Sequence, residues 1–399
     1  MKVLVLSHMY PSTFNEVEGI FVHEQVKALI EKDVEVRVVS PKPWSPFPIN
    51  RLKGKWKEYS QIPVYCEWEG VDVFYPRYLA FPRAWLFANS GKRMYRWIVR
   101  VVRSIYEEFP FDIIHAHVAL PDGYAGTLLA RELKLPLIVT IHGQDLLSTI
   151  NRDDSCRRAL AFAFERASRV ILVSNKLKYL AEDFFGCPEK LTMIPNGVNL
   201  KKVSKSRYKV MEKDGENILL SASSLIPSKA IAYNILAVSR IYNKYPLLRY
   251  LVIGDGPMET KLKAMADSLG LNDCVKFLGR QPHDRVMQYM ANCDIFALPS
   301  WDEAFGVVYV EAMAHGKPVI GCQGEGIEEF VEHGKTGMLV KPRDVDSLVE
   351  ALDFLLGHPA EAKAMGERGR KLVLENYTWE KNAEKTIAVY EEVLRNESQ

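Results

Sequence analysis

The sequence lacks several features that define membrane and secreted proteins. No apolar run approaches the roughly 18 to 20 residues that cross a bilayer. The opening residues, MKVLVLSHMY, lack the long apolar core and the small-residue cleavage site of a signal peptide. The six cysteines are scattered and none is spaced as CxxC, which suits reduced thiols better than disulfides or zinc ligands. We therefore expect a cytoplasmic protein.

The sequence also has little net charge, +2 at pH 7, but its positive charge gathers in the first half. Residues 51–60 and 81–104 interleave lysine and arginine with aromatic residues, and the second stretch contains no Asp or Glu. A helix near 90–106 would carry basic residues on one face and apolar residues on another. The basic set is Lys92, Arg96, Arg100 and Arg103, and the apolar set is Met94, Ile98, Val101 and Ile105. This pattern suits membrane association at the inner face and, equally well, the solvated face of a packed helix.

The chain has the composition of a folded globular protein, with 48% hydrophobic and 26% charged residues. Its 399 residues exceed the usual size of one hydrophobic core, so we expect two domains. Runs typical of strands alternate with helical patterns on both sides of a polar connection, which predicts two parallel sheets covered by helices. The expected α/β organisation is a Rossmann-like domain at 1–200, a linker at 201–216, a second Rossmann-like domain at 217–376 and a C-terminal helix at 377–399.

The segment 294–322 combines a strand, a loop and a helix predicted over 306–315. Glu303 then lies in the loop and Glu311 about one and a half turns into the helix, so both can face one ligand. The start of such a helix offers free amides and a positive dipole end, which suit a phosphate or sugar hydroxyls. These amides belong to Phe305, Gly306 and Val307.

Further residues extend this pattern along the chain. They are Pro299 and Ser300 before Glu303, Ala312 to Ala314 and Gly316 around the helix end, Pro318 to Ile320 in the next strand, and the motifs IPNGV at 194–198 and GDGP at 254–257. In this order the residues resemble the donor-site signature of family-4 retaining glycosyltransferases, over nearly the whole chain. The resemblance implies the GT-B fold, with a central cleft and a C-terminal helix that crosses back to the first domain. It also implies a nucleotide sugar as donor and no obligatory metal or other cofactor.

The resemblance places most donor contacts in the second domain. Glu311 would bind the donor ribose, Glu303 would hold hydroxyls of the transferred sugar, and Lys229 would stabilise charge on the diphosphate. The family usually has an arginine five residues before this lysine and a glycine directly after it. Here Ser224 and Ala230 occupy those positions. Because a serine cannot replace a bidentate arginine clamp, this departure predicts weak activity or compensation by another cation.

Three other segments of the second domain are expected near the donor. Gly254 and Gly256 of the GDGP motif suit a tight turn and, equally well, a donor contact. Backbone groups at 277–280 would recognise the base, for which uridine is preferred. Residues 325–329 would form one wall of the donor pocket, in a form similar to transferases that build teichuronic acid or capsular polysaccharide. That similarity suggests a glycan or lipid-linked acceptor.

The resemblance also assigns residues of the first domain. His142, at the end of a predicted strand, would bind the donor sugar or its leaving oxygen, and Gly19 would present its amide to the diphosphate. His117 and Asn196 are the candidates for acceptor contact. His115 and His117 share one side of a strand, but no nearby Cys or carboxylate completes a metal set, so we expect no metal there.

Two alternatives to a glycosyltransferase acting in cell-surface polysaccharide synthesis stay open at this stage. A nucleotide-sugar 2-epimerase would use the same fold and donor. A non-catalytic subunit that binds the donor would explain the missing arginine at Ser224. In each case the expected partner is a nucleotide sugar, and nucleic acid is not expected.

Overall fold

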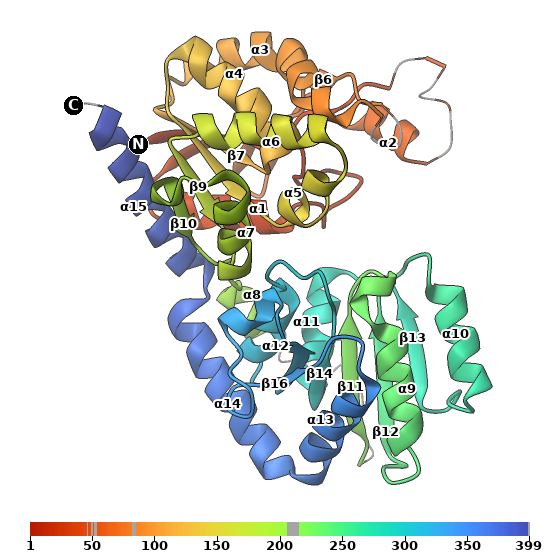
Figure 1. Cartoon of the computed structure of the whole chain (residues 1–399). Helices are drawn as coiled ribbons and strands as arrows, with labels where there is room; N and C mark the ends of the chain where they lie inside the picture. The colour runs from red at the N-terminus through yellow and green to blue at the C-terminus, as the bar shows by residue number, and fades with distance from the viewer. Residues whose placement is uncertain (46, 49–50, 52–53, 82–84, 206–214, 398–399) are drawn as a thin grey trace. The chain divides into compact units, whose positions relative to one another are not determined.

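A computed structural model describes the chain except residues 46, 49–50, 52–53, 82–84, 206–214 and 398–399 (Figure 1). The described chain divides into two compact units. Unit 1 comprises Met1–Asn196 together with Trp379–Gln399, and unit 2 comprises Gly197–Thr378. Within the described residues, no helix is both long enough and apolar enough to span a membrane.

Unit 1 is built on an eight-stranded sheet in the order β10-β9-β8-β7-β1-β2-β5-β4. Every neighbouring pair is parallel except β4 and β5, which are antiparallel. A separate pair, β3 and β6, lies outside this sheet. The strands are β1 (Lys2–Leu6), β2 (Glu35–Val39), β3 (Lys42–Pro43), β4 (Tyr65–Trp68), β5 (Val71–Phe74), β6 (Arg77–Tyr78), β7 (Ile113–His117), β8 (Leu137–Ile141), β9 (Arg169–Leu172) and β10 (Leu191–Met193).

The strands of unit 1 alternate with helices, as expected for parallel strands that need crossover connections. The helices are α1 (Ile20–Ile30), α2 (Lys55–Gln61), α3 (Ser90–Glu108), α4 (Tyr124–Leu133), α5 (Gln144–Leu147), α6 (Asp154–Arg166), α7 (Asn175–Phe185) and α15 (Trp379–Glu397). The strands β7 and β8 are buried along their whole length because both of their faces are covered, although β7 carries two histidines.

The C-terminal helix α15 is part of unit 1, as the sequence predicts. Its residues Trp379, Ala383 and Tyr390 belong to the apolar core that β1 and α1 also form. The amide of Gln25 on α1 donates a hydrogen bond of 2.6 Å to Asn382 on α15. The end of the chain therefore completes the core of the unit that the beginning of the chain starts.

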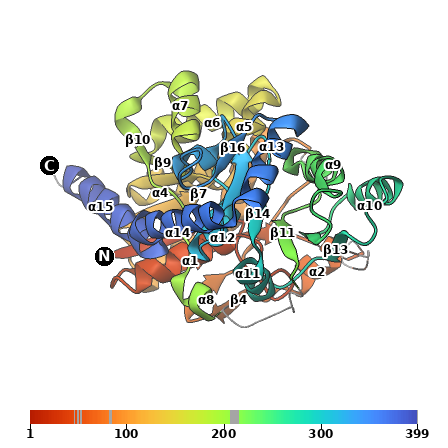
Figure 2. The same ribbon diagram turned by 90° about the horizontal axis from the view of Figure 1, so that it is seen from below.

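Unit 2 has a six-stranded parallel sheet in the order β13-β12-β11-β14-β15-β16. Helix α12 packs against α14, which Figure 2 shows from below. The strands are β11 (Asn217–Ala222), β12 (Leu248–Ile253), β13 (Val275–Gly279), β14 (Ile295–Ala297), β15 (Val319–Cys322) and β16 (Met338–Val340). The helices are α8 (Leu200–Lys205), α9 (Ile231–Ile241), α10 (Glu259–Ser268), α11 (His283–Asn292), α12 (Val307–Ala314), α13 (Val345–Gly357) and α14 (Pro359–Asn376).

The connection between the units differs in part from the linker expected at 201–216. Residues 200–205 form helix α8, which contacts α11 and α12 and buries Val203. These residues therefore belong to unit 2. Most of the remaining expected linker, at 206–214, lies outside the described residues.

In each sheet the chain leaves a central strand on one side and later resumes on its other side. In unit 1 the chain leaves β1 toward β2 and later resumes on the other side of β1 with β7. In unit 2 it leaves β11 toward β12 and resumes on the other side of β11 with β14. Open α/β sheets bind ligands at such switch points, beyond the carboxyl ends of the strands. The loops after β1, β7, β11 and β14 are therefore where functional residues are expected.

Candidate functional site

An ion pair spans the switch point of unit 2. Lys229 ends a short turn after β11, and Glu303 lies in the loop after β14. Lys229 Nζ is 2.5 Å from Glu303 Oε2, and the two side chains are 23% and 14% exposed. Ser300 Oγ donates a second hydrogen bond to the same oxygen, at 3.1 Å. The sequence-predicted residues Lys229 and Glu303 therefore meet in one place that is partly open to solvent.

The loop that carries Glu303 is held on two sides. Its own amide donates a hydrogen bond of 2.7 Å to Glu325, and its carbonyl accepts one of 3.2 Å from Gly326. A Cβ at Gly326 would lie 2.1 Å from the carbonyl oxygen of Ala304, so only glycine allows this approach. The predicted wall at 325–329 thus lies directly against the Glu303 loop.

The start of α12 has the geometry of an anion-binding helix end. Gly306 precedes the helix with a φ of 85°, and a Cβ there would lie 2.4 Å from the ring of Tyr309. The helix begins at Val307, so the first amides have no helical carbonyl to bind. The Phe305 side chain is buried against Phe330, which leaves only its backbone for the predicted ligand contact.

Glu311 has a partner that the sequence analysis missed. His283, the first residue of α11, places its Nε2 2.7 Å from Glu311 Oε1, and the Glu311 side chain is 12% exposed. Glu311, the residue predicted to bind the ribose, is therefore oriented by the imidazole of His283. His283 lies 28 positions away in sequence, and the only signal is its place just after β13, at the carboxyl edge of the sheet.

The predicted glycines after β12 bring two loops of unit 2 together. Gly254 and Gly256 have φ values of 129° and 157°, and a Cβ at either would collide with the carbonyl oxygen of Ser223 or Leu225, at 1.8 Å and 2.6 Å. The neighbouring Ser224 is exposed. These glycines therefore support the loop that follows β11, and their contact with a donor stays a prediction.

In unit 1 the predicted residues His117 and His142 contact each other. Their rings are stacked with centroids 5.2 Å apart, and His117 Nδ1 is 2.9 Å from His142 Nε2. Burial lowers the pKa of His142 to about 3 and that of His117 well below its usual value, so both rings are neutral. One ring must then donate the shared hydrogen to the other.

The third histidine of this column, His115, makes structural contacts. It bonds Tyr390 of α15 at 2.6 Å and Thr140 of β8 at 2.7 Å. Burial lowers its pKa to about 3. In the part of the chain that the structure describes, no group of three or more His, Cys, Asp or Glu side chains is arranged to hold a metal ion.

Gly19 and Asn196 are the other two residues of unit 1 that the sequence predicts in the site. Gly19 caps α1 with a φ of 67°, and a Cβ there would lie 2.2 Å from the carbonyl oxygen of Met9. The loop after β1 therefore requires glycine at this position. Asn196, at the end of unit 1, is 7% exposed, and its contact with an acceptor stays a prediction.

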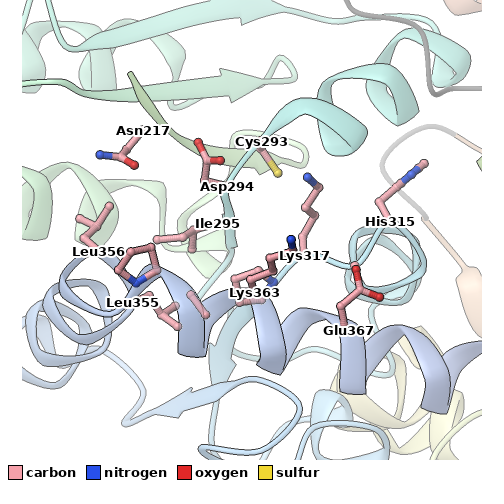
Figure 3. A pocket seen from close by; sticks show the side chains of 14 residues that line it. Asn217, Cys293, Asp294, Ile295, His315, Lys317, Leu355, Leu356, Lys363 and Glu367 are labelled. Carbon is pink, nitrogen blue, oxygen red and sulfur yellow. The ribbon is translucent and has the colours of Figure 1, made fainter. Parts of the chain in front are cut away.

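A cavity of about 350 Å³ opens elsewhere in unit 2 (Figure 3). Asn217 at the start of β11 and Asp294 just before β14 contribute to its lining, together with residues of α13 and α14. It therefore lies at the amino edge of the sheet, opposite the Lys229 and Glu303 pair. A second cavity, of about 410 Å³, lies beside α4 and α6 in unit 1. Gly316 and Pro318 of the signature line the first cavity, but none of the residues predicted to contact the donor or the acceptor lines either cavity.

Comparison with known proteins agrees with this arrangement. Residues 19–202 match the family described as Glycosyltransferase Family 4, and residues 203–372 match Glycosyl transferases group 1. The putative teichuronic acid biosynthesis glycosyltransferase TuaC of Bacillus subtilis is 26% identical over 360 residues, which cover 88% of each chain. Sucrose-phosphate synthase from Thermosynechococcus elongatus has a TM-score of 0.81 at 22% identity and covers 99% of this chain and 100% of its own. Anabaena HepE in complex with UDP and glucose has a TM-score of 0.76 at 21% identity, covering 98% and 100%.

Two parallel α/β units in one chain, with the C-terminal helix packed on the first, define the GT-B fold. The chain belongs to the family-4, group 1 glycosyltransferases, which retain the anomeric configuration of the sugar. Nothing in these similarities favours the 2-epimerase alternative.

Proposed function

We propose that this glycosyltransferase takes a sugar from a UDP-sugar bound by unit 2 and passes it to a glycan or lipid-linked acceptor of a cell-surface polysaccharide. The observation that carries the proposal is the Lys229 and Glu303 pair at the switch point of unit 2. It joins a cation suited to a diphosphate with a carboxylate suited to sugar hydroxyls, beside the open start of α12. The UDP and glucose bound by HepE and the name of TuaC support the choice of donor and acceptor.

The proposed donor contacts follow from the chemistry of each side chain. Lys229 shifts from Glu303 to the diphosphate and stabilises the charge that develops on the departing nucleotide. Glu303 accepts hydrogen bonds from sugar hydroxyls, and Glu311, held by His283, accepts them from the ribose. In unit 1, His142 donates a hydrogen bond to the transferred sugar. Burial lowers the pKa of this ring to about 3, so it donates as a neutral imidazole.

The proposed transfer breaks the bond between the anomeric carbon and the phosphate oxygen and forms a bond from that carbon to the acceptor oxygen. The proton of the acceptor hydroxyl passes to the departing phosphate oxygen. Attack takes place on the face that the phosphate leaves, so the configuration is retained. Neither Glu303 nor Glu311 acts as a nucleophile, because both belong to one loop and helix rather than flanking the sugar bond.

The donor and reaction can be tested together. The protein is screened against UDP, GDP and dTDP sugars by thermal shift, since a ligand that binds the folded state raises the melting temperature. The donors that bind are then incubated with p-nitrophenyl hexosides, and released nucleotide and the anomeric NMR signal of the product are measured. We expect selective stabilisation by UDP-sugars and an α-linked product from an α-linked donor. A 2-epimerised sugar without acceptor, or stabilisation by no nucleotide sugar, would contradict the proposal.

We also propose that the basic face of α3 contacts an anionic membrane. Lys92, Arg96 and Arg100 are exposed on this helix, and the exposed ring of Trp97 contacts that of Trp44 in a tilted arrangement, with centroids 5.3 Å apart. Arg103 is held by an ion pair with Glu132, so it contributes less than the sequence pattern suggests. Each free basic residue near anionic lipid contributes about 1 kcal/mol, which suits reversible binding to a surface that presents a lipid-linked acceptor.

A further inference from the structure

A histidine and an aspartate form a hydrogen-bonded pair that the proposed donor site does not use. His8 follows β1 by two residues, and Asp122 lies in the loop after β7. His8 Nδ1 is 2.7 Å from Asp122 Oδ2, and the backbone amide of His8 donates to both carboxylate oxygens at 3.2 Å and 3.1 Å. The Asp122 side chain is fully buried, whereas the imidazole is 31% exposed. The carboxylate therefore cannot reach a ligand itself, but it fixes a ring that can.

The pair lies at the switch point of unit 1. β1 and β7 are the neighbouring strands between which the chain reverses direction, so His8 and Asp122 join the two loops where a ligand is expected. Unit 2 has the same arrangement, in which Lys229 follows β11 and Glu303 follows β14. Each unit thus carries one cation–carboxylate or imidazole–carboxylate pair across its own switch point.

The loop that carries Asp122, after β7, contains a strained backbone that hydrogen bonds hold in place. The buried, β-branched residue Val118 has a φ of 70° and a ψ of 147°, a region that side chains other than glycine rarely adopt. Asp145 holds the next turn by accepting hydrogen bonds from the amides of Ala119 and Leu120 at 2.9 Å and 3.3 Å. Backbone strain supported in this way is characteristic of functional sites.

The loop after β1 is fixed just as firmly. The buried ammonium group of Lys42 donates to the carbonyl oxygens of His8 and Tyr10 at 2.9 Å and 3.1 Å. It also lies 3.4 Å from Glu18, next to the predicted diphosphate contact Gly19. Buried side chains therefore hold both loops in place, Lys42 for the loop of His8 and Asp145 for the loop of Asp122.

The hydrogen bonding defines what the ring can offer. In the neutral ring, with Nδ1 donating to Asp122, Nε2 carries a lone pair, and it makes no hydrogen bond to any residue that the structure describes. Such a nitrogen accepts a hydrogen bond from a hydroxyl group. Burial lowers the pKa of His8, but the charge and hydrogen bond of Asp122 outweigh it, and the nearby charges of Lys42 and Glu18 act in opposite directions. The pKa of His8 therefore lies above its usual value of 6.5.

We propose that His8, oriented by Asp122, accepts a hydrogen bond from a hydroxyl group of the sugar acceptor and thereby forms the acceptor subsite of unit 1. This inference rests on the proposed transfer reaction and adds the residue that holds its second substrate. His8 contacts the acceptor, and Asp122 is a positioning residue that acts through the ring.

The test uses the full chain with its best UDP-sugar and the p-nitrophenyl hexoside that gives the fastest transfer. The acceptor KM, kcat and the UDP dissociation constant are measured for His8→Phe, His8→Gln, Asp122→Asn and the control His358→Gln, an exposed histidine of unit 2. We expect the acceptor KM of His8→Phe to rise about tenfold, the loss of one hydrogen bond, with UDP affinity unchanged. His8→Gln restores an oxygen near Nε2 and recovers part of the affinity.

Asp122→Asn separates positioning from simple loss of structure. An asparagine amide donates to Nδ1, so the ring turns its Nε2–H outward and can no longer accept from the hydroxyl. We expect an acceptor KM as high as in His8→Phe. In the wild type, kcat/KM for the acceptor falls as the pH drops through the pKa of His8, and this limb is absent in His8→Gln.

Two failures can be told apart. If the wild type transfers sugar but His8→Phe and Asp122→Asn keep its acceptor KM within about twofold, the subsite is wrong while the proposed function stands. If no UDP-sugar stabilises the wild type, the proposed function itself fails.

Discussion

Lys229 Nζ and Glu303 Oε2 lie 2.5 Å apart, although 74 residues separate them in the sequence. Both side chains are largely but not fully buried, so each charged group stabilises the other where water is partly excluded. A diphosphate that approaches Lys229 must compete with Glu303 for the ammonium group. In the proposed donor complex, binding of the diphosphate to Lys229 would therefore release the Glu303 carboxylate, which could then accept hydrogen bonds from the sugar.

Removal of the Lys229 ammonium group should affect the chemical step more than the binding of the donor. We expect Lys229→Ala to lower kcat about 100-fold, because the developing charge on the departing phosphate loses its stabilising partner. Lys229→Arg keeps the charge and should retain part of the activity. The control is Lys244→Ala, which removes an exposed lysine paired with Asp353 in the same unit. Steady-state kinetics check this prediction, and a kcat of Lys229→Ala within threefold of the control would contradict it.

Ala230 explains a glycine preference that the sequence could only note. This residue has a φ of 57° and a ψ of 23°, in the left-handed region, and it caps α9 with its side chain buried. The left-handed conformation costs roughly 1–2 kcal/mol for a residue with a Cβ. The glycine that the family resemblance implies after the lysine would therefore suit the turn that directs Lys229 toward Glu303.

Replacement of Ala230 by glycine should consequently not lower the stability of the protein. We expect Ala230→Gly to have a free energy of unfolding equal to or above that of the wild type, because relief of the left-handed strain offsets the greater flexibility of the unfolded chain. Ala237→Gly, at a fully buried position inside α9, should instead lose about 1 kcal/mol or more. Urea unfolding of the two variants provides the comparison, and equal losses at both positions would show that the backbone at Ala230 is not strained.

Ser224 leaves room for the arginine that the family usually has. Its side chain is exposed and lies on the loop that follows β11, five residues before Lys229. We expect Ser224→Arg to raise kcat/KM for the donor about tenfold, since a guanidinium adds charge-assisted hydrogen bonds to phosphate oxygens. Ser224→Lys supplies the charge without the bidentate geometry and should gain less. Unchanged kinetics in both variants would mean that another group already fills this role.

The sequence predicted the fold well because strand and helix periodicities are local properties. It also placed Glu303 and Lys229 at the ends of strands, where a parallel sheet brings separate loops together. It could not predict the partners of these residues. The pairing of His8 with Asp122 depends on β1 and β7 being neighbours, and that of His283 with Glu311 depends on the packing of α11 against α12. Neither strand order nor helix packing is a local signal.

The same limit applies to the histidines of β7. Period-two alternation put His115 and His117 on one side of the strand, and both do face the same way, with ring centroids 4.5 Å apart. Their different roles come from distant residues. Tyr390, from the last helix of the chain, binds His115, whereas His142, from the neighbouring strand exit, binds His117.

The membrane contact of α3 should depend on charge. We expect the protein to sediment with vesicles of phosphatidylglycerol and phosphatidylcholine at low salt and to be released by about 0.5 M NaCl, because screening weakens attraction between charges near a surface. The triple variant Lys92→Glu, Arg96→Glu, Arg100→Glu should lose this binding without losing affinity for UDP. Salt-insensitive binding, or binding by the triple variant, would exclude an electrostatic contact.

The buried histidines of unit 1 should make this unit sensitive to acid. Burial lowers the pKa values of His115 and His142 to about 3 in the folded state, against 6.5 in the unfolded chain. The unfolded state therefore binds more protons at these two histidines, and their contribution to the stability of unit 1 falls as the pH drops from about 6.5 toward 3. Asp145 acts in the opposite direction, because burial raises its pKa to about 7 and the folded state takes up its proton first.

One substitution can isolate the histidine contribution from that of Asp145. We expect His142→Gln to reduce the slope of unfolding free energy against pH by up to about 1.4 kcal/mol per pH unit near pH 5, the value for one proton. Tryptophan fluorescence during urea unfolding reports on this, since every tryptophan except Trp301 belongs to unit 1. His358→Gln, at an exposed position of unit 2, is the matched control and should leave the slope unchanged. An unchanged slope in His142→Gln would mean that this ring is protonated near pH 5 in the folded protein, which would contradict its lowered pKa.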